Sequence, residues 1–107
     1  MSDILDPAEL IDYSPGAVVS RTLIKGKAGS ATLFSFDKGE GLDEHSAPFD
    51  ALIHVLDGEA AITLGGKRHL LKAGRMLLMP AGAPHAVKAV ARFKMLLFLV
   101  RNSPLTK

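Results

Sequence analysis

The sequence predicts a single all-β domain, a sandwich or barrel of short antiparallel strands. Between residues 17 and 100, apolar or alternating runs follow one another, and turn residues separate them at nearly regular intervals. Many short strands at such spacing are typical of these two architectures. At 107 residues the chain has the length of one ordinary domain and can bury one core. Hydrophobic residues make up 48% and charged residues 22%, which is a globular composition.

Residues 1–16 are expected to form an N-terminal extension. Asp6-Pro7 can cap and begin a short helix around Ala8–Ile11, because proline is tolerated in the first helical turn. The turn residues Ser14-Pro15-Gly16 would then end this helix. The β-domain is expected to occupy residues 17–107.

From residue 17 on, strand-like runs alternate with turns. The clearest turn is Gly65-Gly66, because two glycines can both take the positive φ angles of a two-residue hairpin. The expected strands are Val18–Ile24, Ala31–Asp37, Ala51–Leu56, Ala60–Leu64, Lys67–Leu71, Met76–Met79, His85–Ala89 and Phe93–Val100.

The composition excludes several kinds of protein. The chain has no cysteine, so any metal would be bound by nitrogen and oxygen ligands. Residues 1–16 contain no basic segment followed by an apolar core, and every apolar run is far shorter than the roughly 18 residues of a membrane-spanning helix. We therefore expect a cytoplasmic protein with no membrane partner.

Charge is distributed unevenly along the chain. The net charge is +2, but all 11 acidic residues lie at or before Glu59, and only basic charges follow it. Basic surfaces are one feature of nucleic-acid-binding proteins. Strands from the two halves of an antiparallel barrel interleave, however, so this segregation need not produce a patch. Only Tyr13 and five phenylalanines are available for base stacking. We expect no nucleic-acid partner.

Two blocks of spaced glycines and histidines lie on either side of a predicted hairpin. They are Gly39, His45 and Gly58 in the first block, and Gly74, Pro80, Gly82 and His85 in the second. These blocks resemble the two sequence motifs of the cupin superfamily, and the resemblance covers most of the chain from about residue 17 onward. It implies a double-stranded β-helix, also called a jelly-roll barrel, of the small single-domain, conserved-barrel type.

The resemblance also implies where a metal would bind. Cupins typically hold a divalent metal, often iron, manganese, nickel or zinc, with three histidines and a glutamate. Of these ligands, the first and last histidines correspond to His45 and His85, but the second histidine corresponds to Ala47 and the glutamate to Ala51. An asparagine that often follows corresponds to Ala89. Two imidazoles alone form an incomplete shell, which water or a chelating ligand would have to complete.

Nearby side chains are the other candidates for the site. Asp50 is the nearest carboxylate, but it precedes Ala51 by one residue, so on a regular strand the two should face opposite sides. An irregular turn at residues 46–48 would shift this parity. By the same count His54 should point outward, and His69 is expected to be an ordinary exposed residue. His45 and His85 could instead be buried histidines that only hydrogen-bond backbone carbonyls.

Alternation predicts the walls of the pocket. Lys94 should avoid the interior, which turns Phe93, Met95, Leu97 and Leu99 inward. The expected ligand pocket is therefore mostly apolar and contains His45, Phe49, Asp50, Ala51, Ile53, His85, Met95 and Leu97.

The outward positions of the last strand, Leu96, Phe98 and Val100, are apolar as well. A solvated face would be polar, so this face should pack against something, and a second copy of the chain is the economical partner. The resemblance agrees, since cupins of this type are commonly homodimers. The alternative is that the apolar residues of the N-terminal extension fold back over this face.

Three kinds of function fit these residues. The first, which we favour, is the binding of a small, partly apolar molecule in the barrel without a complete metal site. The second is a metal-dependent oxygenase, isomerase or decarboxylase, which would use two histidines and open coordination positions. The third is a dimeric interaction module that acts through a partner.

Overall fold

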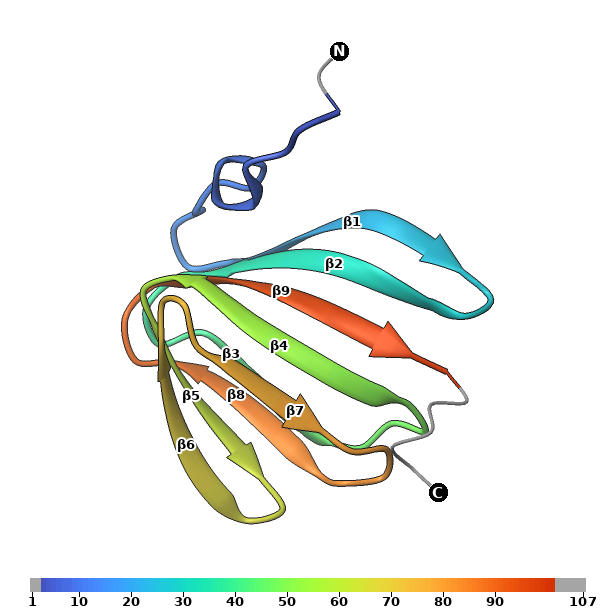
Figure 1. Ribbon diagram of the computed structural model, residues 1–107. Helices are drawn as coiled ribbons and strands as arrows, with labels where there is room; N and C mark the ends of the chain where they lie inside the picture. Colours follow the sequence, from blue (N-terminus) through green and yellow to red (C-terminus); the bar gives the residue numbers. More distant parts are fainter. Residues whose placement is uncertain (1–2, 102–107) are drawn as a thin grey trace.

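The computed structural model describes residues 3–101, which form two antiparallel β-sheets packed face to face (Figure 1). The five-stranded sheet has the order β1-β2-β9-β4-β7, and the four-stranded sheet has the order β3-β8-β5-β6. The strands are β1 (Val18–Gly26), β2 (Gly29–Phe36), β3 (Gly41–His45), β4 (Asp50–Asp57), β5 (Glu59–Leu64), β6 (Lys67–Lys72), β7 (Met76–Met79), β8 (His85–Ala89) and β9 (Phe93–Val100). The predicted all-β fold class is confirmed.

The core lies between the two sheets. Phe36 of β2 and Phe93 of β9 are register partners, and their rings stack with centroids 4.5 Å apart. Both are fully buried, as are Val55 of β4 and Ile62 of β5. Alternate positions of each strand thus fill the space between the sheets, and each large apolar side chain buried there contributes about 2 kcal/mol to stability.

Gly58, between β4 and β5, lies where another strand passes close by. Its φ angle is 77°, and a Cβ atom added to it would overlap the carbonyl oxygen of Arg92. A side chain is therefore excluded by both the backbone conformation and the available space. The fold therefore requires glycine at position 58, the last position of the first motif.

The strands lie close to their predicted positions, and the Gly65-Gly66 hairpin is confirmed. Leu64 pairs with Lys67, and the two glycines have φ angles of 57° and 83°. The sequence pattern does not predict β3, because its residues are mostly exposed and it lacks the apolar alternation of the other strands. It forms a strand by pairing with β8.

A short helical element forms near the predicted Ala8–Ile11 helix, but it begins earlier and is shorter than predicted. The structure has one turn of 3-10 helix over Pro7–Glu9, and the side chain of Asp6 makes no capping hydrogen bond. Proline begins the turn as expected. The first turn of a helix costs more conformational entropy than its hydrogen bonds return, and without a side-chain cap the helix does not extend beyond this turn. No helix in residues 3–101 is long and apolar enough to cross a bilayer.

The N-terminal extension lies against the outer face of the five-stranded sheet. The Ser35 hydroxyl donates to the carbonyl of Asp12 at 2.8 Å, and the Lys94 ammonium donates to the carbonyl of Ala8 at 2.6 Å. Ile11 is buried. The extension therefore covers part of this face within one chain, as the alternative to dimerisation expects.

Tyr13 anchors the extension to the barrel. Its hydroxyl donates to the Asp57 carboxylate, and the charged ends of Arg92 and Lys94 lie 4.6 and 4.9 Å from its ring centroid. Burial and the hydrogen bond to Asp57 raise the pKa of Tyr13 above its ordinary value.

Candidate functional site

A cavity of about 160 Å³ lies between the sheets at the end where β4 and β8 begin and β3 and β9 end. In Figure 1 this is the end toward which the β9 arrow points. Apart from two histidines, every side chain that lines it is apolar. The lining residues are Leu42, His45, Ala47, Phe49, Ala51, Ile53, Met79, His85, Val87, Met95, Leu97 and Leu99.

His45 and His85 are brought together by strand pairing. His45 is the last residue of β3 and His85 the first of β8, and the two are register partners. Their ring centroids lie 4.3 Å apart, with the planes inclined by 63°. His45 is exposed and His85 half-buried, so the pair stands where the cavity meets solvent.

Each ring is held by the backbone of its own segment. Nδ1 of His45 lies 2.9 Å from the carbonyl oxygen of Asp43, and Nδ1 of His85 lies 3.1 Å from that of Ala83. A carbonyl oxygen can only accept, so Nδ1 must carry the proton in both rings. In the neutral rings both Nε2 atoms then keep a free lone pair, which can accept a hydrogen bond or bind a metal.

The positions of the two missing metal ligands face the same cavity. Ala47 and Ala51 line it together with His45 and His85, so all four positions of the implied ligand set converge on one space. Methyl groups cannot bind a metal. Within residues 3–101, no group of three or more histidine, cysteine, aspartate or glutamate side chains is placed to hold one. The residues present therefore do not fit a complete metal centre.

Asp50 does not line the cavity, which corrects its predicted place in the pocket. Ala51 pairs with Leu99, which lines the cavity, and Asp50 pairs with Val100 on the opposite face. Strand parity therefore holds despite the irregular turn before β4. Of the other predicted pocket residues, His45, Phe49, Ala51, Ile53, His85, Met95 and Leu97 all lie at the cavity.

Asp50 instead fastens the loop that leads into β8. It is 2% exposed, and its Oδ1 atom accepts a hydrogen bond from the backbone N–H of Ala81 at 2.8 Å. Its Oδ2 atom is buried and has no hydrogen-bond partner among the described residues. Gly82 adds a second link, since its N–H donates to the carbonyl of Ala47 at 2.8 Å. These two bonds join the segment that carries the alanines to the loop that precedes His85.

The cavity also contains residues that the sequence analysis does not assign to the pocket. Leu42 is missed because its strand, β3, is not predicted. Two further lining residues could have been found from the second motif. Val87 follows His85 by two residues and therefore faces the same side of its strand, and Met79 immediately precedes the motif proline Pro80. At the rim, the guanidinium of Arg101 lies 5.0 Å from the ring centroid of Phe49.

His54 and His69 lie away from the histidine pair. His54 pairs with Leu96 and Met76 on the outer face of the five-stranded sheet. His69 is half-buried, not exposed as expected, because it pairs with Ile62 and so faces inward.

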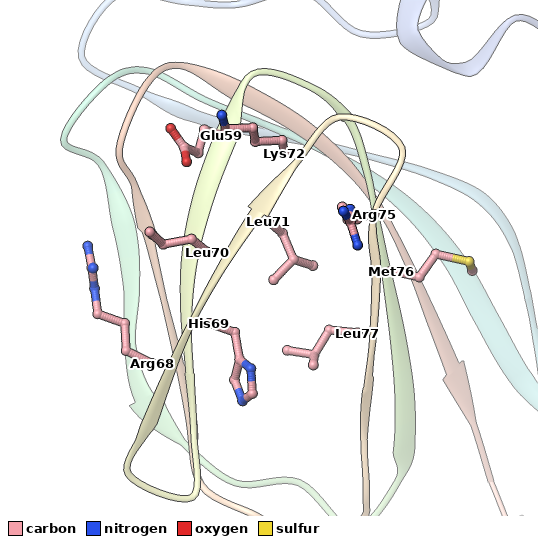
Figure 2. A pocket seen from close by; sticks show the side chains of 9 residues that line it. All are labelled: Glu59, Arg68, His69, Leu70, Leu71, Lys72, Arg75, Met76 and Leu77. Carbon is pink, nitrogen blue, oxygen red and sulfur yellow. The ribbon is translucent and has the colours of Figure 1, made fainter.

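A groove of about 780 Å³ runs between the edge strands β6 and β7 (Figure 2). His69 lines it together with Leu71 and Leu77, while Arg68, Lys72 and Arg75 add basic charge. The groove shares no residue with the cavity.

Comparisons with known proteins agree with this architecture. A family model described as Cupin domain matches residues 32–100. A conserved protein of unknown function from Streptococcus pyogenes is 36% identical with a TM-score of 0.90, over 96% of this chain and 90% of its own. A cupin superfamily protein from Desulfitobacterium hafniense is 32% identical with a TM-score of 0.89, over 95% and 94%. A Cupin 2 conserved barrel domain protein from Leptotrichia buccalis is 45% identical with a TM-score of 0.85, over 88% of this chain and 46% of its own. No curated protein matches the chain.

Proposed function

Since this chain belongs to the cupin family, we propose that it uses the family's barrel cavity to bind a small, partly apolar molecule without a complete metal shell. The cavity carries this proposal. Its wall is made of aliphatic, methionine and phenylalanine side chains, and its polar groups are the two imidazoles at the mouth. Concave, mostly apolar sites with few polar groups are typical of small-molecule binding.

The size of the cavity limits the ligand. An apolar cavity of roughly 150 Å³ is large enough to take up benzene, and the cavity here has about 160 Å³. A ligand with one ring would fill the apolar part and place its substituents near His45 and His85. Apolar contact contributes about 25 cal/mol per Å² removed from water, so this wall supplies most of the affinity.

We also propose that the protein forms a homodimer through the outer face of the five-stranded sheet. The N-terminal extension covers only part of that face. Leu78 and Val100 are 46% and 45% exposed, and Met76 is 51% exposed. Burying such an apolar face against a second copy would remove it from water.

A cavity-filling variant tests the binding proposal. Ala51 is 4% exposed and lines the cavity, so Ala51→Leu should occupy the space and weaken the binding of toluene at least about ten-fold. The matched control is Ala86→Leu, because Ala86 pairs with Thr63 on the outer face of the other sheet. Calorimetric titration of both variants provides the measurement. Equal toluene affinity in the two variants, or no binding to the unmodified protein, would refute the proposal.

A further inference from the structure

We propose that the histidine pair selects hydrogen-bond donors, so that the preferred ligands are small neutral molecules with an apolar body and two neighbouring hydroxyl groups. This inference rests on the proposed function, since it names the class of ligand for the same cavity. Its basis is the orientation of both imidazoles together with the chemistry of the remaining wall.

The tautomers determine what the rings offer a ligand. Both Nδ1 atoms donate to backbone carbonyls, at 2.9 Å for His45 and 3.1 Å for His85. Each neutral ring therefore presents Nε2 to its other side as an acceptor. Both strands orient their histidine in this way, so the residues that line the cavity offer two acceptors; the nearest side-chain donor, the Arg101 guanidinium, lies over Phe49 at the rim and outside the lining.

The other lining residues provide no side-chain hydrogen-bond donor to a ligand. All other side chains at the cavity are alanine, valine, leucine, isoleucine, methionine or phenylalanine. A carboxylate placed inside the cavity would meet two lone pairs and would lose its hydration without gaining a side-chain donor from the lining residues, which is costly in an apolar site. A molecule without donors would leave both Nε2 atoms unpaired whenever it displaced their water.

A cationic ligand is disfavoured for a different reason. An ammonium group could donate to the imidazoles, but its charge would need a nearby carboxylate to offset desolvation. Three carboxylates are next in sequence to lining residues, Asp43, Glu44 and Asp50, and none of them lines the cavity; Asp50 faces away and binds Ala81. Neutral hydroxyl groups satisfy the same acceptors without this cost.

The two rings are close enough for one ligand to contact both. The ring centroids of His45 and His85 lie 4.3 Å apart. A ligand with hydroxyl groups on neighbouring carbon atoms can therefore donate one hydrogen bond to each ring, while its ring or chain fills the apolar space beyond.

Three probes of similar shape, o-xylene, 2-methylphenol and catechol, carry no, one and two hydroxyl groups, and they test this inference. Affinities are measured by calorimetry with a chelator present, in the unmodified protein and in His45→Leu, His85→Leu and the double variant. The preference for catechol over o-xylene should fall about five-fold with each histidine removed, the effect of one ordinary hydrogen bond. This preference is the ratio of the catechol affinity to the o-xylene affinity in one variant. The probes differ in hydration, but this difference is the same for every variant and cancels when the ratios are compared.

His69→Leu is the matched control, because His69 lies outside the cavity and its loss should leave the ratio unchanged. An unchanged ratio in the double variant, with o-xylene still bound, would overturn the inference and leave the proposed function intact. A catechol preference that appears only after a divalent metal is added would also overturn it. If no probe binds to the unmodified protein, the proposed function itself fails.

A second measurement does not depend on the variants folding. In ¹⁵N spectra of the unmodified protein, catechol should keep the Nε2 resonances of both His45 and His85 at the upfield shifts of hydrogen-bonded acceptors, and o-xylene should not move them further upfield. Protonated Nε2 and unprotonated Nδ1 in the free protein would contradict the inference.

Discussion

His45 and His85 face each other across the β3–β8 pair, each with Nδ1 directed to a carbonyl two residues earlier in the chain. The backbone therefore orients both rings before any ligand arrives. Such orientation of an imidazole by a carbonyl is common around metal ligands, but here Ala47 and Ala51 stand where two further ligands would complete a shell. The same geometry leaves two acceptors at the mouth of an apolar cavity.

Restoring the missing ligands should create a metal site. Because Ala47 and Ala51 face the same cavity as the histidines, the double variant Ala47→His, Ala51→Glu should bind Ni²⁺ or Zn²⁺ at least about a hundred-fold more tightly than the unmodified protein. Calorimetry on chelator-treated protein measures this. The control places the glutamate on the outer face, as Ala47→His, Ala86→Glu. Equal metal affinity in the two double variants would show that the four positions do not converge.

The Asp50 carboxylate should stabilise the loop that precedes His85. Asp50→Ala leaves the Ala81 N–H without its acceptor and should lower the free energy of unfolding by about 1–3 kcal/mol, measured in urea. Asp50→Asn keeps the side-chain oxygen and should lose less. Amide exchange at Ala81 should accelerate in the alanine variant. Unchanged stability together with unchanged exchange would contradict this role.

Tyr13 is the only tyrosine, so the ultraviolet absorbance of tyrosinate reports on it alone. Burial and its hydrogen bond to Asp57 raise its pKa, so the native state favours the protonated form. Its contribution to stability is fully present below the unfolded pKa of about 10 and is lost as pH rises through the higher folded value. The titration midpoint should therefore lie above 10, and Asp57→Asn should lower it without restoring the ordinary value. A midpoint of about 10 in the unmodified protein would contradict the anchoring of the extension.

Gly58 and Gly82 both have a left-handed backbone conformation, but only Gly58 also lacks space for a side chain. Their φ angles are 77° and 83°, but a Cβ atom at Gly58 would overlap Arg92, whereas nothing lies within 4 Å at Gly82. Gly82→Ala should cost about 1–2 kcal/mol, the ordinary penalty for a left-handed conformation. Gly58→Ala should cost clearly more or prevent folding, as thermal unfolding will show. Equal losses would mean that β4, β5 and the neighbouring segment adjust freely.

Dimerisation should depend on the outer face of the five-stranded sheet. Leu78→Lys places a charge on that face and should weaken the dimer at least about ten-fold in sedimentation equilibrium. Leu70→Lys is the matched control, because Leu70 is 56% exposed on the outside of the other sheet. A monomeric unmodified protein, or equal effects of both variants, would contradict the proposed interface.

Much of the fold could be predicted because turn residues separate the strands. The Gly65-Gly66 hairpin needs positive φ angles at both positions, and the last strand alternates so that Met95 and Leu97 face inward. Strand β3 could not be predicted, since Asp43 and Glu44 interrupt any apolar pattern and its pairing with β8 is a long-range contact.

The candidate site was predictable to the extent that motif spacing and strand parity define it. His45 and His85 follow from the spaced glycines, and their meeting across two strands requires the fold. Asp50 shows the limit of an argument from proximity in the sequence, because a difference of one residue turns its side chain away from the cavity. The tautomers depend on carbonyls whose positions no sequence pattern specifies.

Methyl spectra of ¹³C-methionine-labelled protein test ligand binding in the cavity most directly. Met79 and Met95 line the cavity, whereas Met76 is 51% exposed on the outer face and serves as an internal control. Titration with o-xylene should shift the methyl resonances of Met79 and Met95 with one common saturation curve and leave that of Met76 unchanged. Unchanged Met79 and Met95 resonances, or a shift confined to Met76, would contradict the account.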